Sequence, residues 1–313
     1  MKKLLLLLAM GGIIFTACTS GGRLDENSSG NSNEQPSNSN QNGNQDDDND
    51  KDKVKCVITY TSTDNKVIEV HDYDFYPAQI ISNTYTNGKG EIKFNNLFSE
   101  IGGFAFENCI TLHNITLPQC VKTIGSYAFD GCISLQSITI PNSISLIEPC
   151  AFRDCSSLIS ITLPDNITSI EESTFEGCSK LTDIIIPNNI TTIKGYAFNG
   201  CSSLINITIP NSVYSLGNGV FRNCSNLSIA TIGSGVDSIG TSIFTNCKNL
   251  KNVYCKPTTP PTGGSTDMFE YHNENNHTYK IGCTIHVPRS SLTAYKTARF
   301  WSKYESYIKP YDF

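Results

Sequence analysis

Residues 129–155 read FDGCISLQSITIPNSISLIEPCAFRDC and contain one complete unit of a repeat that runs through more than half of the chain. The unit begins with Phe129 and Cys132, and the same pair returns 23 residues later as Phe152 and Cys155. A period kept without insertion or deletion indicates a solenoid, in which each unit is one coil packed against its neighbours. A Phe stands three residues before the Cys and a Leu three residues after it in every unit, around Cys109, Cys132, Cys155, Cys178, Cys201, Cys224 and Cys247.

Each unit also contains the pattern of a short strand. Residues 137–140 alternate polar and apolar side chains, which is the period of a strand with one buried face, and Pro141 ends the strand. The spacing from Ala151 to Cys155 suits one helical turn on the far side of the coil. We expect the stacked coils to place their strands in a parallel ladder about 4.8 Å apart, with Phe, Leu and Ile in continuous internal columns.

The motif Leu-x-x-Ile-x-Ile-Pro, followed by Ala-Phe-x-x-Cys, resembles the leucine-rich repeats of the BspA-like family of bacterial surface proteins. The resemblance covers residues 90–256. It implies a β-rich α/β solenoid, a right-handed leucine-rich-repeat stack of 23-residue coils with a parallel strand ladder and short helical turns, capped at both ends. The motif weakens at Ala230, Gly233, Cys255 and Lys256, so we expect the last coils to be distorted.

Both ends of the repeat resemble terminal segments of the same family. Residues 58–64 and 80–85 are similar to the segment before the repeats, and residues 285–288 with Trp301 are similar to the closing segment. An open stack exposes unpaired strand edges and apolar columns, so different segments must cover them. We therefore predict an N-terminal cap over residues 54–89 and a C-terminal cap over residues 257–313.

The first residues have the features of a bacterial export signal. Lys2 and Lys3 precede an apolar run over residues 4–15, which is too short to span a bilayer. Phe15-Thr16-Ala17-Cys18 resembles the lipobox of bacterial lipoproteins. We therefore expect a lipoprotein signal peptide over residues 1–17 and lipid attachment at Cys18, while an ordinary secretory signal with an incidental Cys18 is the alternative.

Residues 18–53 contain almost no large apolar side chain and include an acidic run over residues 46–52. Such a composition predicts a disordered tether that holds a domain away from a membrane. A calcium loop is the weaker interpretation, because the run lacks the Gly turn and terminal Glu of such loops.

The residue after Cys18 is Thr19 and not the Asp that often marks inner-membrane retention of lipoproteins. The expected location is therefore the outer membrane or cell surface, with membrane contact through the lipid anchor only.

The thirteen cysteines have a structural interpretation. The regular seven occupy one inward position per coil, where parallel Cβ vectors disfavour disulfides, so we expect buried thiols. Cys255 and Cys283 are candidates for a bridge, with free thiols the favoured alternative. No CxxC pair is present, and we assign no metal site.

Few residues point to chemistry. The five histidines have no spacing that suggests a nucleophile with its base, and His113 is expected to be exposed at a strand edge. His272 and His277 with Glu270 and Glu274 could suggest zinc, although their loop-like setting favours chance. The formal charge of −6 argues against nucleic acid as a partner. We predict no enzyme activity and no cofactor.

The outward side of the strand ladder remains as the candidate binding surface. Alternation directs a Thr away from the core in most coils, which gives a broad, polar and weakly charged face suited to proteins or glycans. Thr is also simply a good residue at solvent-facing strand positions. The candidate partner-binding residues are Asn114, Thr116, Ser137, Thr139, Ser160, Thr162, Asp183, Asn206 and Thr208.

These features predict a cell-surface recognition or adhesion module that binds host or neighbouring-cell macromolecules. The family resemblance implies extracellular-matrix or other surface proteins as partners. The alternatives are a carbohydrate-capture lipoprotein, a non-catalytic scaffold, and an enzyme with its site in residues 257–313. Carbohydrate capture requires exposed aromatic residues clustered on one face, whereas Tyr127, Tyr196 and Tyr214 are scattered through the coils.

Overall fold

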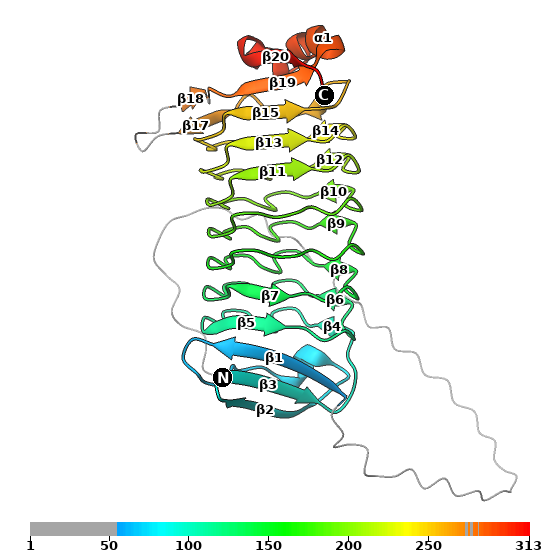
Figure 1. Ribbon diagram of the computed structural model, residues 1–313, viewed down its shortest axis with the longest axis vertical. Coiled ribbons are helices and arrows are strands. Elements are labelled where there is room, and N and C mark those ends of the chain that lie inside the picture. The colour runs from blue at the N-terminus through cyan, green and yellow to red at the C-terminus, as the bar shows by residue number, and fades with distance from the viewer. Residues whose placement is uncertain (1–54, 273–274, 276–277, 281) are drawn as a thin grey trace, which may run out of the picture. The chain divides into compact units, whose positions relative to one another are not determined.

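The computed structural model describes residues 55–272, 275, 278–280 and 282–313. The predicted signal peptide, the lipid-attachment residue Cys18 and the tether lie outside these residues. The described chain is a β-solenoid of about nine coils of about 23 residues, stacked into an elongated body (Figure 1). The predicted leucine-rich-repeat solenoid is therefore confirmed.

An antiparallel sheet precedes the coils. It consists of β1 (Cys56–Ser62), β2 (Ile80–Thr86) and β3 (Lys89–Phe94), in the order β2-β3-β1. β1 also pairs antiparallel with β5 (Leu112–Thr116), the first strand of the parallel ladder, so the sheet continues directly into the stack. Phe75 of the short helix η2 (Asp72–Phe75) packs on Phe94 and Phe106 and covers the apolar end of the first coil.

Short parallel strands lie along two sides of the stack, whereas the 23-residue period predicts only the first of these ladders. Ile115 pairs with Ile138 in the first ladder, and Thr192 pairs with Ser215 in the second. The first ladder is in two parts, with β5 and β7 (Ser137–Thr139) in one sheet and β11 (Asn206–Ile209), β13 (Ile229–Ile232) and β15 (Asn252–Cys255) in another. Residues 158–164 and 181–187 of the two coils between these parts form no paired strand. The second ladder is also in two parts. One sheet contains β4 (Glu100–Ile101), β6 (Thr123–Ile124) and β8 (Leu146–Ile147), and the other contains β9 (Ser169–Ile170), β10 (Thr192–Ile193), β12 (Ser215–Leu216), β14 (Ser238–Ile239) and β16 (Thr262–Gly263).

The Ala-Phe-x-x-Cys segment forms consecutive turns, and the predicted helical turn is wrong. The Cys132 amide donates to the Phe129 carbonyl within the turn at 3.2 Å, whereas the Phe129 amide donates to the Ala151 carbonyl of the next coil at 2.8 Å. Tyr127 has a positive φ of 59°, which a right-handed helix does not allow. Alternate amides thus bond between coils, which gives this side of the stack its own set of inter-coil hydrogen bonds.

Phenylalanine rings form one continuous column through the core. Successive rings are stacked with centroids between 5.0 and 5.7 Å apart and planes inclined by 2–17°. All of these side chains are fully buried, so each coil adds its apolar surface to the same core. The column consists of Phe106, Phe129, Phe152, Phe175, Phe198, Phe221, Phe244 and Phe269.

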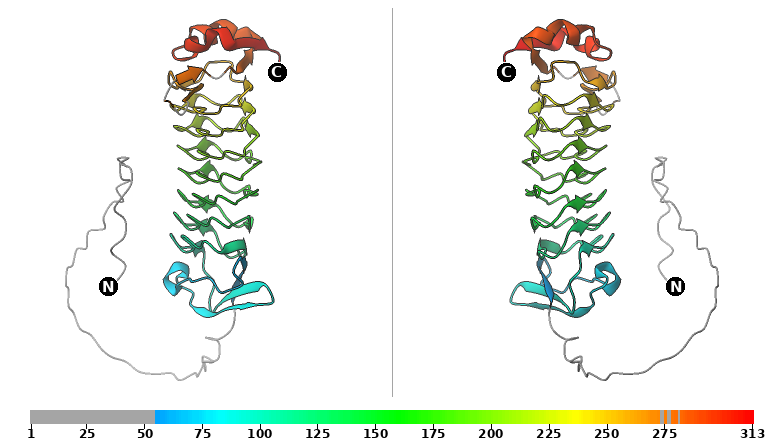
Figure 2. Two further views of the ribbon diagram at one scale, coloured as in Figure 1. Left: turned by 90° about the vertical axis from the view of Figure 1, so that its left-hand side faces the viewer. Right: turned by 90° about the vertical axis from the view of Figure 1, so that its right-hand side faces the viewer.

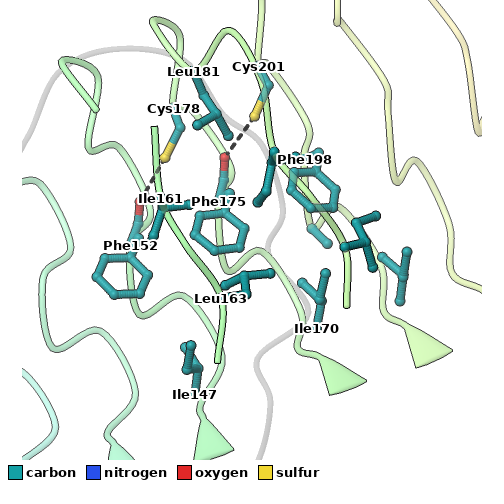
Figure 3. Packing of buried hydrophobic residues seen from close by; sticks show 14 of the residues in the cluster. Ile147, Phe152, Ile161, Leu163, Ile170, Phe175, Cys178, Leu181, Phe198 and Cys201 are labelled. Atoms are coloured by element: carbon teal, nitrogen blue, oxygen red, sulfur yellow. Dashed lines mark hydrogen bonds between the residues drawn. The ribbon is translucent and has the colours of Figure 1, made fainter. Parts of the chain in front are cut away.

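Six of the seven repeated cysteines, from Cys132 to Cys247, lie beside this column as buried thiols, as predicted, whereas Cys109 is half-buried. From Cys132 to Cys247, each thiol donates a hydrogen bond of 3.0–3.2 Å to the carbonyl of a Phe in the preceding coil. Figure 3 shows this arrangement for Cys178 with Phe152 and for Cys201 with Phe175. Each sulfur therefore satisfies a main-chain oxygen inside the core.

The last coils are regular, and the expected distortion is wrong. Ala230 is fully buried and pairs in register with Ile207 and Val253. A side chain at Gly233 would lie 2.4 Å from the Pro210 carbonyl oxygen, so the departure from the motif at this position accommodates close contact between coils.

Parallel pairing continues past residue 256. β15 pairs with β19 (Thr284–Pro288), which pairs with β20 (Ile308–Tyr311). The intervening chain includes a hairpin of β17 (Glu270–His272) and β18 (Thr278–Lys280). Cys255 and Cys283 are both buried and free. Cys255 is the last residue of β15, whereas Cys283 precedes β19, whose first residue pairs with Asn252 at the start of β15, so the two cysteines are not aligned for a bridge.

A short helical segment closes the C-terminal end, as Figure 2 shows. It comprises η3 (Arg289–Ser291), α1 (Leu292–Thr297) and η4 (Trp301–Tyr307). Trp301 is buried against Tyr295 and Phe269, and its indole N–H donates to the Pro261 carbonyl at 3.1 Å. These rings cover the last member of the phenylalanine column.

Candidate macromolecule-binding face

The outward side of the first ladder, here called the strand face, brings all nine candidate residues onto one surface. Inter-coil pairing aligns Asn114 with Ser137 and Thr116 with Thr139. Asn114 is half-buried, and the other eight residues are exposed. The alternation between inward and outward positions is kept in the two central coils, where Ile161 and Ile184 are buried while Thr162 is exposed.

Hydrogen bonding differs along the strand face. At its N-terminal end, the Asn114 side-chain amide donates to the Thr61 hydroxyl at 3.0 Å, and the Ser137 hydroxyl donates to the Asn114 carbonyl oxygen at 2.6 Å. Farther along, the hydroxyls of Thr162 and Thr208 have no hydrogen-bond partner among residues 55–313 that the structure describes. These hydroxyls are free to bond to a ligand.

Exposed isoleucines interrupt the polar surface in the central coils. Ile185 occupies the outward column that Thr fills in neighbouring coils, and 79% of its surface is exposed. Ile159 and Ile205 lie at the starts of the adjacent outward segments and are 46% and 50% exposed. The sequence places Ile185 at an outward position through its alternation, but the periodicity alone does not indicate that Ile159 and Ile205 are exposed.

Aromatic side chains extend the strand face at its C-terminal end. Tyr254 pairs with Thr231 on one side and His286 on the other, so it continues the outward column. Its ring stacks on the His286 ring with centroids 4.6 Å apart, while Tyr311 and Phe313 meet it edge-on. Sequence reasoning missed this cluster because 28 residues separate β15 from β19, although the alternation of Ile285, His286 and Val287 is a strand signal.

The cluster is nearly uncharged. The His286 Nε2 lies 3.0 Å from the Asn252 side-chain oxygen, and burial lowers the pKa of His286 below its usual value. Tyr311 and Phe313 remain 40% and 51% exposed. Both protein side chains and sugar rings can pack on flat aromatic surfaces that lie next to polar hydroxyls.

Strong ion pairs lie away from the strand face. Arg153 forms a bidentate pair with Asp130 in the preceding coil, at 2.7 and 2.8 Å, and stacks over Tyr127. The arrangement lies on the turn side and joins successive coils. The charged groups of Arg153 and Asp130 therefore bind each other within the protein.

His113 differs from its predicted exposure. It is half-buried, and its Nδ1 is buried without a hydrogen-bond partner. β1 covers β5 at this position, where the register shifts between Thr61 and Ser62. The sequence pattern of β5 alone cannot reveal that a strand from outside the repeat covers it.

The predicted zinc alternative gains no support from the described part of the chain. Glu270 is buried and accepts a hydrogen bond from the Lys303 ammonium at 2.6 Å. Within the described ranges, no group of three or more His, Cys, Asp or Glu side chains is placed to hold a metal ion. His277 and Glu274 lie outside those ranges.

None of the described helices has the length and apolar composition needed to cross a membrane.

Comparison with known proteins places the repeats in a family. The BspA type leucine rich repeat region, in six copies, matches residues 78–190 and 168–285. A leucine-rich-repeat protein of T. pallidum is 29% identical, with a TM-score of 0.38 over 53% of this chain and 67% of that protein. A leucine-rich cell surface protein of Faecalibacterium prausnitzii is 22% identical, with a TM-score of 0.39 over 69% and 74% of the two chains.

A leucine-rich-repeat protein from Bacteroides ovatus is 23% identical, with a TM-score of 0.31 over 67% of this chain and 71% of that protein. No curated protein matches the chain. The match to the repeat region spans well over half of the 313 residues and coincides with the coils described above. The chain belongs to the BspA type leucine-rich repeat family.

Proposed function

We propose that this protein is a non-catalytic recognition or adhesion module at a cell surface, and that its strand face binds a protein of a host or a neighbouring cell. The observation that carries the proposal is the strand face itself, on which exposed side chains from successive coils are aligned along one side of the solenoid. Family membership supports a role in binding other macromolecules at the surface.

The composition of the strand face favours a protein ligand. Protein interfaces combine an apolar centre with a polar rim, and a few apolar or aromatic anchors supply most of the affinity. Ile185, which is 79% exposed, offers such an anchor. The hydroxyls of Thr162 and Thr208 provide a polar surround.

We also propose that a lipid on Cys18 anchors the chain and that residues 18–53 act as a tether between the membrane and the solenoid. The export signal and the lipobox-like residues support this arrangement. About 35 flexible residues have an r.m.s. reach of roughly 30–35 Å. The expected location is the outer membrane or cell surface, where the strand face can meet a partner.

The test is binding of the mature chain to arrays of extracellular-matrix proteins and of glycans. A strand-face variant carries Thr139→Lys, Thr162→Lys and Thr208→Lys. A matched control carries Ser145→Lys, Thr168→Lys and Thr191→Lys, which are exposed residues next to the second ladder. The proposal predicts that a protein ligand is lost by the first variant and retained by the second. Equal binding by both variants would contradict it.

Carbohydrate capture is a second candidate, and the aromatic cluster at the end of the strand face favours it. Sugar rings pack on exposed aromatic faces, and Tyr311 and Phe313 are the most exposed members of this cluster. Glycan binding that Tyr311→Ala abolishes, without any binding to proteins on the array, would support this function in place of adhesion.

A further inference from the structure

Two cysteines outside the column of repeated thiols meet at the N-terminal end of the solenoid. Cys56 is the first residue of β1, and Cys120 lies in the turn between β5 and β6. Their sulfur atoms are 2.7 Å apart, although 64 residues separate them in the chain. A disulfide bond is about 2.05 Å long, so only a small displacement separates this contact from a covalent bond.

The other described cysteines are placed differently. The six repeated thiols, from Cys132 to Cys247 at intervals of 23 residues, donate to main-chain carbonyl oxygens. Among the twelve described cysteines, Cys56 and Cys120 are the only two whose sulfur atoms are in contact with each other. Proximity of sulfur atoms is therefore specific to this pair and is not a by-product of the 23-residue period.

The repeat explains why Cys120 reaches Cys56. Its position corresponds to Ser143 and Ser212 in later coils, and these hydroxyls donate to carbonyl oxygens of the preceding coil at 2.6 and 2.7 Å. A side chain at this position thus points back by one layer. For the first coil, the preceding layer is the N-terminal sheet, and Cys56 of β1 stands there.

We propose that Cys56 and Cys120 form a disulfide that fastens the N-terminal sheet to the first coil when the protein is exported. The oxidant is the disulfide of a protein thiol oxidoreductase of the exported compartment. The two cysteines together lose two protons and two electrons, and the disulfide of the oxidant is reduced to two thiols.

Exposure gives the order of the two steps. Cys120 is half-buried, whereas 6% of Cys56 is exposed, so Cys120 is the thiol that the oxidant reaches. The Cys120 thiolate attacks the oxidant's disulfide and forms a mixed disulfide, releasing one thiolate. The Cys56 thiolate then attacks the Cys120 sulfur, which forms the intramolecular bond and releases the second thiolate. Burial raises the pKa of the Cys56 thiol, so the second step in the folded chain accelerates as pH rises.

The bond has a mechanical consequence, which rests on the proposed anchor at Cys18. Tension on a tethered molecule reaches the described body at residue 55 and passes first into β1, which hydrogen bonds hold to β3 and β5. A covalent link from Cys56 to Cys120 carries that load directly into the first coil. The disulfide therefore prevents β1 from being peeled away from the stack.

The direct test is a thiol map of the full-length chain, exported with its own leader in a bacterial host and isolated without reductant. The protein is unfolded at acidic pH, free thiols are alkylated, and peptides are identified by mass spectrometry. The proposal predicts that Cys56 and Cys120 resist alkylation and occur in one linked peptide. Alkylation of both cysteines in this protein would overturn it.

Two variants and one control complete the experiment. Cys56→Ser is expected to leave Cys120 open to alkylation, and Cys120→Ser to leave Cys56 open. Cys109→Ser, which removes a half-buried free thiol at the same end, should leave the linked peptide intact.

Thermal unfolding gives a second measurement. Reductant should lower the thermal midpoint of the wild-type chain by roughly 5–10 °C and leave the double Ser variant unchanged. A wild-type midpoint insensitive to reductant would contradict the proposed fastening. None of these readouts depends on binding through the strand face, so they fail or succeed independently of the proposed function.

Discussion

At the scale of single residues, the phenylalanine column accounts for much of the stability. The sequence predicts the column because Phe recurs at a fixed place in each unit, but it gives no sign that Phe269 extends it. Phe269 follows Phe244 by 25 residues instead of 23, so strict periodicity misses it. In the structure, Phe244 has a stacked ring on both sides, at 5.6 and 5.7 Å.

Replacement of a column ring by Ala should therefore cost nearly the same at each interior position. We predict a loss of about 3–5 kcal/mol for Phe175→Ala, Phe198→Ala and Phe244→Ala, because each change leaves a large cavity in a close-packed core. Chemical denaturation measures the loss. A distinctly smaller effect at Phe244 would show that the column weakens before its C-terminal end.

The buried thiols give a pH prediction at the same scale. Burial raises the pKa of Cys224 from 9.0 to about 12. The folded state therefore binds more protons than the unfolded state between these pH values, and stability decreases as pH rises through this window. Denaturation between pH 8 and 11 should show this decrease, and Cys224→Ala should reduce it. An identical alkaline slope in the variant would refute the assignment.

At the scale of elements, the sequence predicts the parallel strands but not the turn side. An Ala-Phe-x-x-Cys spacing fits a helical turn and a run of tight turns equally well. The alternate amides that bond to the next coil decide between them, and these bonds join residues 22 positions apart, beyond the reach of local pattern. The partial burial of His113 by β1 was not predicted for the same reason, because β1 and β5 are far apart in the sequence.

The ion pair between coils on this side should stabilise the stack. Arg153→Met leaves the Asp130 carboxylate, whose side chain is 8% exposed, without its partner. Because Arg153 is one-third exposed, we discount the cost of a buried pair to about 1–2 kcal/mol. The exposed pair of Arg289 and Asp312 is the control, and Arg289→Met should not change the thermal midpoint measurably. Equal effects of the two variants would contradict the argument.

At the scale of the whole molecule, the two ends limit what sequence periodicity can predict. The pattern stops at the ends of the repeat, whereas the parallel ladder continues through β19 and β20. The aromatic cluster that extends the strand face depends on this continuation, so the candidate site was predicted only for the regular coils. The alternation of the repeat indicates the outward position of Ile185, but it does not indicate that Ile159 and Ile205 are exposed.

The side chain that closes the C-terminal end should contribute as much to the free energy of unfolding as any interior ring of the phenylalanine column. Trp301 is buried, packs near Phe269 and donates a hydrogen bond to the Pro261 carbonyl. Trp301→Ala should lower the unfolding free energy by about 3–5 kcal/mol, which chemical denaturation would detect. Phe313→Ala, an exposed aromatic change at the same end, is the control and should have little effect. A stability unchanged by Trp301→Ala would mean that this segment does not close the stack.

The central claim is that the strand face binds a protein partner, and the most direct test is the affinity of a ligand from the array for Ile185→Ser. Ile133→Ser is the matched control, since Ile133 is 48% exposed but lies on the turn side. If Ile185 anchors the interface, its loss should weaken binding at least about tenfold with no change in thermal midpoint, whereas the control binds normally. Undiminished affinity of the Ile185→Ser variant, or an equal loss in both variants, would contradict recognition through the strand face.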